Sequence, residues 1–134
     1  GRWRFLPEQD ATVAIAGSVL ALTGALFAAW SKAALGRHFS PQLGVQAGHR
    51  LITTGPYAVV RHPMYLGIID FIIGTALYLN DVALFGAGLL FIVYFSAQSR
   101  VEERLFADHF GAEWRAYSER TPRLFPWSFR RRPR

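Results

Sequence analysis

Apolar residues fall into three long runs along this chain, separated by polar segments. Ala11–Trp30 contains twenty residues without a charged side chain, and a helix of that length spans roughly 30 Å, the thickness of the hydrocarbon core of a bilayer. Leu66–Leu79 and Val82–Ser99 are runs of fourteen and about eighteen residues on either side of the polar pair Asn80–Asp81. Fourteen residues are few for a crossing, so we expect Tyr65 to complete the second span at the interface. The pattern predicts three transmembrane helices, the last two forming a hairpin.

The helical spacing of apolar residues continues beyond the third run. From Val101 to Tyr117 they recur mostly at intervals of three or four residues. Gly111 can end one helix in a left-handed conformation, and Ala112–Arg120 then predicts a short helix that stops at Thr121. We therefore predict an all-α fold, a polytopic membrane helical bundle with cytoplasmic helices near its C-terminus. Its three long helices are expected over residues 11–32, 65–79 and 82–110.

Composition agrees with one membrane-embedded domain over residues 1–134. The chain is 51% hydrophobic and 18% charged, and the charges are clustered rather than scattered as on a soluble surface. The alternative is a buried hairpin in a soluble bundle, but the rest of the chain is too short to cover three apolar helices. Because the chain begins with Gly rather than Met, we expect a fragment that lacks at least one upstream helix.

The basic residues predict an orientation in the membrane. The net charge is +6, and nine of the fifteen Lys and Arg residues lie from Arg100 onward. Cytoplasmic segments of membrane proteins are enriched in Lys and Arg. We therefore expect the loop over residues 35–64 and the segment over residues 111–134 to be cytoplasmic, and Asn80–Asp81 to lie on the opposite side. The arginine-rich tail over residues 130–134 favours anionic lipid, and with so apolar a body we expect no nucleic-acid partner.

Cysteine and histidine usage limits the chemistry. The chain has no cysteine, which excludes disulfides, thiolate catalysis and cysteine metal ligands. His38, His49 and His109 do not have the spacing of metal ligands, so we expect no metal site and assign them to loops or surface.

A dense polar and aromatic segment, Gly55–Gly67, precedes the second apolar run. Pro63 disfavours helix at His62 and can itself be the first helical residue. A helix that starts there presents free amides and a positive dipole end, which can hold a carboxylate or phosphate. Arg61 adds a cation and Tyr65 an aromatic face. The alternative is an interfacial anchor in which these side chains contact headgroups.

Glu102 and Glu103 follow the third run on the same predicted side of the membrane. If the hairpin closes, they face the Arg61–Tyr65 segment. Neighbouring helical residues point about 100° apart, so we expect one glutamate to bind a ligand while the other pairs with Arg100 or Arg104. Carboxylates suit ribose hydroxyls or an ammonium group, and aromatic rings suit a sulfonium. The alternative is a pair of solvated charges at a helix end.

These segments carry a family resemblance. The chain resembles the isoprenylcysteine carboxyl methyltransferases and the related phospholipid methyltransferases over about residues 30 to 127, with the motifs in the same order and spacing. The motifs are Leu35-Gly36-x-x-Phe39-Ser40, Gly55-Pro56-Tyr57, Arg61-His62-Pro63-x-Tyr65-x-Gly67, Glu102-Glu103, Phe110-Gly111-x-x-Trp114-x-x-Tyr117 and Pro122-Arg123.

The resemblance implies a multi-pass membrane enzyme that uses S-adenosylmethionine at a cytoplasm-facing site and a lipophilic acceptor from the bilayer. It implies cofactor binding by the loop motif and the glutamate pair, and therefore by Arg61, His62, Pro63, Tyr65, Gly67, Glu102 and Glu103. Arg61 and His62 are also our candidates for catalytic residues.

Asp70 belongs to none of these motifs. A carboxylate inside a membrane span is costly unless it is paired or faces water, and its presence suggests function. Asp70 lies eight residues past His62, about 12 Å along a helix. We expect it to line an acceptor tunnel, or else to pair with a helix outside this chain.

The reaction type follows from the absence of an evident base. A carboxylate acceptor is already a nucleophile at neutral pH, whereas an amine or thiol must lose a proton, and only His62 is a candidate to accept it. This favours O-methylation of an isoprenylcysteine-type carboxylate over methylation of a phospholipid or another amine or thiol. The acceptor and the oligomeric state stay open.

Two other functions remain as alternatives. One is a membrane sterol reductase that uses NADPH, since such enzymes resemble this family near their C-termini. They typically have Asn and an acidic residue where this chain has Met64 and Ile68, which argues against that alternative. The other is a membrane scaffold without catalytic activity.

Overall fold

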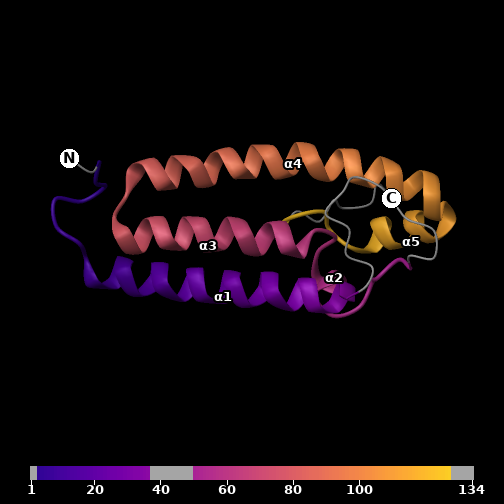
Figure 1. Ribbon diagram of the computed structural model, residues 1–134, viewed down its shortest axis with the longest axis horizontal. Coiled ribbons are helices and arrows are strands. Elements are labelled where there is room, and N and C mark those ends of the chain that lie inside the picture. The colour runs from indigo at the N-terminus through magenta and orange to yellow at the C-terminus, as the bar shows by residue number, and fades with distance from the viewer. Residues whose placement is uncertain (1–2, 37–49, 128–134) are drawn as a thin grey trace.

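The computed structural model describes residues 3–36 and 50–127, and within these it contains helices and no strand (Figure 1). Three long helices lie side by side, and two short ones lie at one end of them (Figure 1). The long helices are α1 (Ala11–Leu35), α3 (Pro63–Leu79) and α4 (Val82–Phe110), and the short ones are α2 (Pro56–Val59) and α5 (Ala112–Arg120). The prediction of an all-α chain is confirmed for the described residues. His38, Phe39, Ser40, His49 and the arginine tail over residues 130–134 lie outside them.

The ends of the helices follow from local sequence. The Asp10 side chain caps α1 by accepting hydrogen bonds from the amides of Thr12 and Val13 at 2.8 and 3.1 Å. Pro63 is the first residue of α3, two positions before the predicted range, because its missing N–H costs nothing there. Gly111, with φ 56°, separates α4 from α5, as its sequence predicts.

The α3–α4 turn is closed by Asn80 and by the segment that precedes α1. Asn80 adopts the left-handed conformation, with φ 53°. Its side-chain oxygen accepts hydrogen bonds from the amides of Phe5 and Leu6 at 2.9 and 3.1 Å, and its nitrogen donates to the Leu6 carbonyl. The Val82 amide donates to the carbonyl of Trp3. These bonds hold the N-terminal segment against the turn, at the end of the bundle opposite α2 and α5 (Figure 1).

Helices α1 and α3 touch backbone to backbone through four glycines. A Cβ on Gly24 would lie 2.7 Å from the Gly67 carbonyl oxygen, and one on Gly74 would lie 2.3 Å from the Ala21 nitrogen and 2.6 Å from the Gly17 oxygen. Real structures do not tolerate such approaches, so these positions admit only glycine. Small residues let membrane helices approach this closely and gain dispersion energy along their length.

Two helices, α1 and α4, are long and apolar enough to cross a membrane. Only 11% and 17% of the residues in their apolar stretches are buried, which fits the surface of an integral membrane protein better than the core of a soluble one. Helix α3 has 17 residues and is about 26 Å long, short of the hydrocarbon thickness. The prediction of three spans is therefore not confirmed: α3 lies beside the other two without the length to cross alone.

The buried core gathers at the α2 and α5 end. It joins the α2–α3 loop, the first turns of α3, the middle of α4 and the segment after α5. Its buried members are Val60, Leu66, Ile69, Phe95 and Leu124. This packing brings the loop, α4 and the C-terminal segment together and thereby positions the polar groups described next.

Candidate active site

The predicted hairpin brings the loop motif and the glutamate pair into contact. His62 immediately precedes α3, and Glu102 and Glu103 lie on α4, beyond its apolar part. Side chains from the two segments hydrogen-bond directly. A third segment, Thr121–Phe125, joins them after α5. Sequence analysis did not assign this segment to the site.

Glu103 is the centre of a nearly buried ion-pair cluster. Its carboxylate accepts from Arg61 Nε at 2.9 Å and Nη2 at 3.3 Å, from His62 Nε2 at 3.0 Å and from Arg123 Nε at 3.0 Å. The side chain is only 11% exposed. We expected a glutamate to pair with Arg100 or Arg104, and this expectation is wrong for Glu103. Its carboxylate points away from its own helix, toward the loop and the C-terminal segment, where other elements supply the cations.

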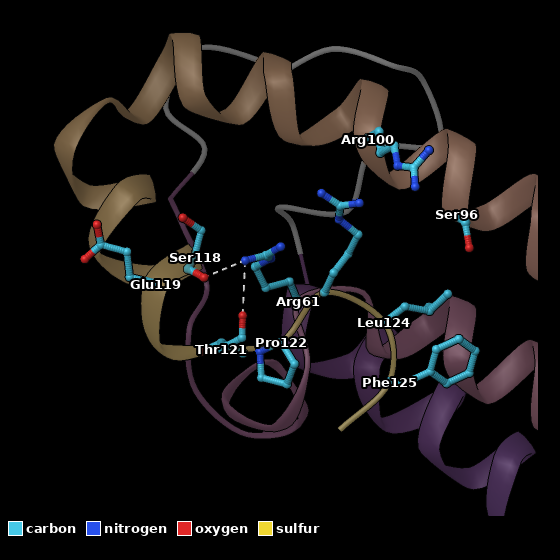
Figure 2. A pocket seen from close by; sticks show the side chains of 10 residues that line it. Arg61, Ser96, Arg100, Ser118, Glu119, Thr121, Pro122, Leu124 and Phe125 are labelled. Atoms are coloured by element: carbon cyan, nitrogen blue, oxygen red, sulfur yellow. Dashed lines mark hydrogen bonds between the residues drawn. The ribbon is translucent and has the colours of Figure 1, made fainter. Parts of the chain in front are cut away.

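Arg61 is engaged by the protein itself. Besides its two bonds to Glu103, Nη1 donates to the carbonyls of Ser118 and Thr121 at 2.6 and 3.1 Å (Figure 2). Four of its five N–H groups are thus used. The Arg61 amide also donates to the Pro122 carbonyl at 2.9 Å. Arg61 therefore fastens the segment after α5 to the loop and has little capacity left for a ligand.

The tyrosines of the two flanking motifs brace this arrangement. The Tyr117 hydroxyl donates to the Tyr57 carbonyl at 2.7 Å, and the Tyr57 hydroxyl donates to the Ser31 carbonyl on α1 at 3.4 Å. Both side chains are buried. They tie α5 to α2 and α2 to α1, which fixes the loop that carries Arg61 and His62.

Glu102 has different surroundings from its neighbour. One carboxylate oxygen accepts a short hydrogen bond from the Tyr65 hydroxyl, and the other lies 3.5 Å from His62 Nδ1. No arginine among the described residues reaches it within ion-pair distance. Its side chain is 22% exposed, twice the fraction of Glu103. Glu102 is thus the glutamate with room for a further partner.

His62 lies buried between the two carboxylates. Burial alone lowers its pKa, but hydrogen bonds and charge attraction from Glu102 and Glu103 outweigh burial and raise the pKa above its ordinary 6.5. The two ring nitrogens face the two carboxylates, Nε2 at 3.0 Å from Glu103 and Nδ1 at 3.5 Å from Glu102. A ring engaged on both sides by the protein is poorly placed to accept a proton from a substrate.

An aromatic column leads from His62 into the bundle. The rings of His62 and Tyr65 are parallel, with centroids 5.5 Å apart, and Tyr65 stacks on Phe95 at 4.3 Å. Phe95 was missed by sequence analysis, although it lies seven residues before Glu102 on the same face of α4. The column joins the polar cluster to the apolar interior and gives it an aromatic face.

A cavity of about 490 Å³ opens beside the cluster, within the size range of small-molecule sites. Its walls come from α4, from the end of α5 and from the segment after α5 (Figure 2). They combine arginines, hydroxyls and apolar side chains. The lining residues are Arg61, Ser96, Arg100, Ser118, Glu119, Thr121, Pro122, Arg123, Leu124 and Phe125.

Of the predicted site residues, Arg61 alone lines this cavity, and two others, Gly67 and Asp70, face α1. Gly67 packs against Gly24 and Ala28, which explains why this position has no side chain. The Asp70 Cβ lies beside Gly24, and Asp70 does not line the cavity. Within residues 3–36 and 50–127, Asp70 has no recorded ion-pair partner, and no group of side chains is suited to a metal ion.

The sequence is similar to known proteins of one family. A family profile described as phospholipid methyltransferase matches residues 12–113. The chain is 27% identical over 119 residues to protein-S-isoprenylcysteine O-methyltransferase B of Arabidopsis thaliana, covering 87% of this chain and 57% of that protein. It is 35% identical over 77 residues to the cobalt-zinc-cadmium resistance protein CzcN of Cupriavidus metallidurans, covering 57% of this chain and 35% of that one. The chain thus spans about a third to somewhat over half of these relatives.

The fold has a counterpart among solved structures. The eukaryotic intramembrane Ras methyltransferase, an isoprenylcysteine carboxyl methyltransferase, superposes with a TM-score of 0.79 at 24% identity. The superposition covers 87% of this chain and 43% of that one. The family match covers α3, α4 and nearly all of α1 and includes Arg61, His62 and both glutamates of the polar cluster, whereas Arg123 lies beyond it. The chain belongs to the phospholipid methyltransferase family.

Proposed function

We propose that this protein transfers a methyl group from S-adenosylmethionine to the carboxylate of a lipophilic, isoprenylcysteine-type acceptor at the membrane–cytoplasm interface. The observation that carries the proposal is the partly exposed carboxylate of Glu102, which Tyr65 and His62 contact. The cavity of about 490 Å³ adjoins the same ion-pair cluster through Arg61 and Arg123, although Glu102 itself does not line it. The names of the relatives support the same reaction, since one is an isoprenylcysteine O-methyltransferase and the solved counterpart is a carboxyl methyltransferase.

The residues present fit S-adenosylmethionine. Glu102 offers a carboxylate to ribose hydroxyls or to the ammonium of the methionine part. The stacked rings of His62, Tyr65 and Phe95 offer an aromatic face, and Tyr65 in particular can attract a sulfonium. When bound, the cofactor would supply the electrophilic methyl group. We assign Glu102 and Tyr65 to its binding, and Glu103 and Arg61 to the support of those groups.

Catalysis by this chain would rest on positioning and on exclusion of water. Glu103 fixes His62, and His62 and Tyr65 fix Glu102, so the groups around the cofactor are ordered before it binds. Phe95, Leu124 and Phe125 provide an apolar wall that keeps water from the reacting atoms. The bound cofactor would supply the methyl group, and an acceptor carboxylate, which is already deprotonated at neutral pH, would need no base from this chain.

An amine acceptor is the alternative that the family description favours. A protonated amine must lose a proton before it can attack. His62 contacts carboxylates through both ring nitrogens, and these carboxylates raise its pKa. Both nitrogens are thus engaged, which leaves neither to take a proton from an amine. This argues for the carboxylate acceptor over a phospholipid amine.

The site requires a particular arrangement in the membrane. We propose that α1, α3 and α4 all cross the bilayer, with α3 completed at its ends by the α2–α3 loop and by the Asn80 turn. The polar cluster would then face the cytoplasm and the turn the opposite side, consistent with the excess of arginine from Arg100 onward. Reporters fused after residue 134 and inserted at Asn80–Asp81 should lie on opposite sides. Finding both on one side contradicts the arrangement.

Ligand titration tests the proposed function directly. The protein in nanodiscs should bind S-adenosylmethionine and S-adenosylhomocysteine by calorimetry, should not bind NADPH, and should methylate N-acetyl-S-farnesylcysteine. Glu102→Gln should weaken cofactor binding about ten- to a hundredfold, as expected for a lost charge-assisted hydrogen bond. Asp108→Asn, an exposed acid later on α4, is the matched control. Binding of NADPH alone would instead favour a reductase.

A further inference from the structure

One guanidinium group on the cavity wall is not used by the fold. Three arginines line the cavity, Arg61, Arg100 and Arg123. Arg61 and Arg123 both bond to Glu103. Arg100 is exposed on α4, and no hydrogen bond or ion pair to another described residue is recorded for it. Its five N–H donors are therefore available to whatever enters the cavity.

The charges around the cavity favour an anion. Glu119 is the one acidic residue among those that line it, and Glu103 lies behind Arg61 and Arg123. Three arginines thus face two carboxylates, which leaves one positive charge in excess, on the side of Arg100. Figure 2 shows Arg100 extending from α4 at the cavity, whereas Thr121 and Pro122 belong to the segment after α5.

The other side chains on the cavity wall indicate which further groups the ligand carries. Ser96 lies one helical turn before Arg100, at the end of the apolar run of α4, and Leu124 and Phe125 form an apolar part of the wall. A ligand here meets a cation and hydroxyls next to hydrocarbon. Arginine recognises a carboxylate in particular, because its planar fork matches the two oxygens.

We propose that Arg100 binds the carboxylate of a ligand in this cavity, the role that the loop motif alone suggested for Arg61. The inference rests on the proposed function for the identity of the two candidate ligands. The carboxylate belongs either to the methionine part of the cofactor or to the acceptor. Arg100 is in either case a specificity residue, since it distinguishes an acid from its neutral analogue.

Charge-matched ligand pairs test the inference. Binding to the protein in nanodiscs of zwitterionic lipid is measured for S-adenosylmethionine against its decarboxylated form, and for N-acetyl-S-farnesylcysteine against its carboxamide, each without the other substrate. Arg100→Gln should lower affinity for the acid of one pair about ten- to a hundredfold and leave the neutral analogue unchanged. Arg100→Lys should retain part of that affinity. Arg104→Gln, one turn further along α4 and not on the cavity wall, should change neither.

The outcomes separate this inference from the proposed function. The pair that responds identifies which carboxylate Arg100 holds. Any of three results would overturn the inference. Arg100→Gln could lose the same affinity for the acid as for its neutral analogue, or Arg100→Gln and Arg104→Gln could lose affinity equally. The wild-type protein could also bind the acid and neutral forms with equal affinity. Failure of the wild-type protein to bind S-adenosylmethionine would overturn the proposed function, while the acceptor pair would still test Arg100.

Discussion

Helix α3 is held in two opposite ways, by close packing along its length and by ion pairs at its start. Along its length, α3 packs on α1 through glycines whose backbones nearly touch, and this contact contains no charged pair. Just before its first residue the chain is fixed by an ion-pair cluster, in which Glu103 of α4 binds Arg61 and His62 of the α2–α3 loop and Arg123 of the segment after α5. The glycine interface forms because side chains are absent, whereas the ion-pair cluster requires the side chains of Glu103, Arg61, His62 and Arg123.

This difference separates stability from function. The glycine interface packs backbone against backbone along two helices, so it provides a rigid support. The ion-pair cluster is costly to bury unless every charge is paired, and it orders Glu102, Tyr65 and the cavity wall. We infer that substitutions at the glycine interface prevent folding, whereas substitutions in the ion-pair cluster mainly disorder the candidate site.

The largest effect is expected at the glycine interface. Gly74→Leu introduces a side chain whose Cβ alone would lie 2.3 Å from the Ala21 nitrogen, and because that atom is backbone, α1 and α3 must separate. We expect loss of folded protein, measured as recovery in the monodisperse peak after detergent extraction. Gly86→Leu is the control, since a Cβ there meets nothing within 4 Å. Normal recovery of the Gly74 variant would show that the helices are not in close contact.

The next largest effect is expected at Glu103. Glu103→Gln leaves Arg61 and Arg123 without their carboxylate, and breaking a buried pair in this way costs about 3–5 kcal/mol. Thermal unfolding should show a large decrease for this variant. Glu102→Gln should show a small one, because its carboxylate has no recorded arginine partner and is more exposed. Equal losses of stability would contradict the division of roles between the two glutamates.

A pH dependence of intermediate size is expected from His62. Its pKa is raised in the folded protein, so its stabilising contribution is fully present below the ordinary pKa of about 6.5 and is lost as the pH rises through the raised value. The melting temperature should therefore decrease with rising pH in this window, and His62→Gln should flatten the decrease. His109→Gln, at the exposed end of α4, should not. An unchanged profile in the His62 variant would mean that its pKa is not raised.

The smallest effect on cofactor affinity is expected at Asp70, which lies against α1 and away from the cavity. We propose that it contacts the acceptor path or a partner helix, and Asp70→Asn distinguishes the two. Altered turnover with unchanged melting favours the acceptor path, and lowered melting with normal turnover favours a helix partner. Cofactor affinity should stay within about threefold of wild type, a change of less than about 0.7 kcal/mol. A larger loss would place Asp70 at the cofactor.

Sequence reasoning was most successful where structure is local. The helix end at Gly111, the hairpin at Asn80–Asp81 and the short helix after Gly111 follow from residues that are close in the chain. The meeting of His62 with the glutamates also followed, because two helices joined by a tight turn must bring their far ends together.

It was least successful where partners come from distant segments. The path of Thr121–Phe125 is not encoded in the periodicity of α4 and α5. This path decides that Arg61 donates to the carbonyls of Ser118 and Thr121 and that Arg123 bonds to Glu103. The position of Gly67 in a motif suggested a ligand, but its contact with Gly24 depends on how α1 packs.

The amino-acid sequence by itself determined the three long helices and α5, their apolar stretches and the end of the bundle at which the polar residues gather. Only the tertiary structure decided which of two adjacent glutamates is enclosed by cations and which stays open. The physical reason is angular: neighbouring residues on a helix point about 100° apart, so the side chains of Glu102 and Glu103 leave α4 in different directions. Their partners, Tyr65 for one and Arg61 with Arg123 for the other, are set by the packing of three separate segments around that helix.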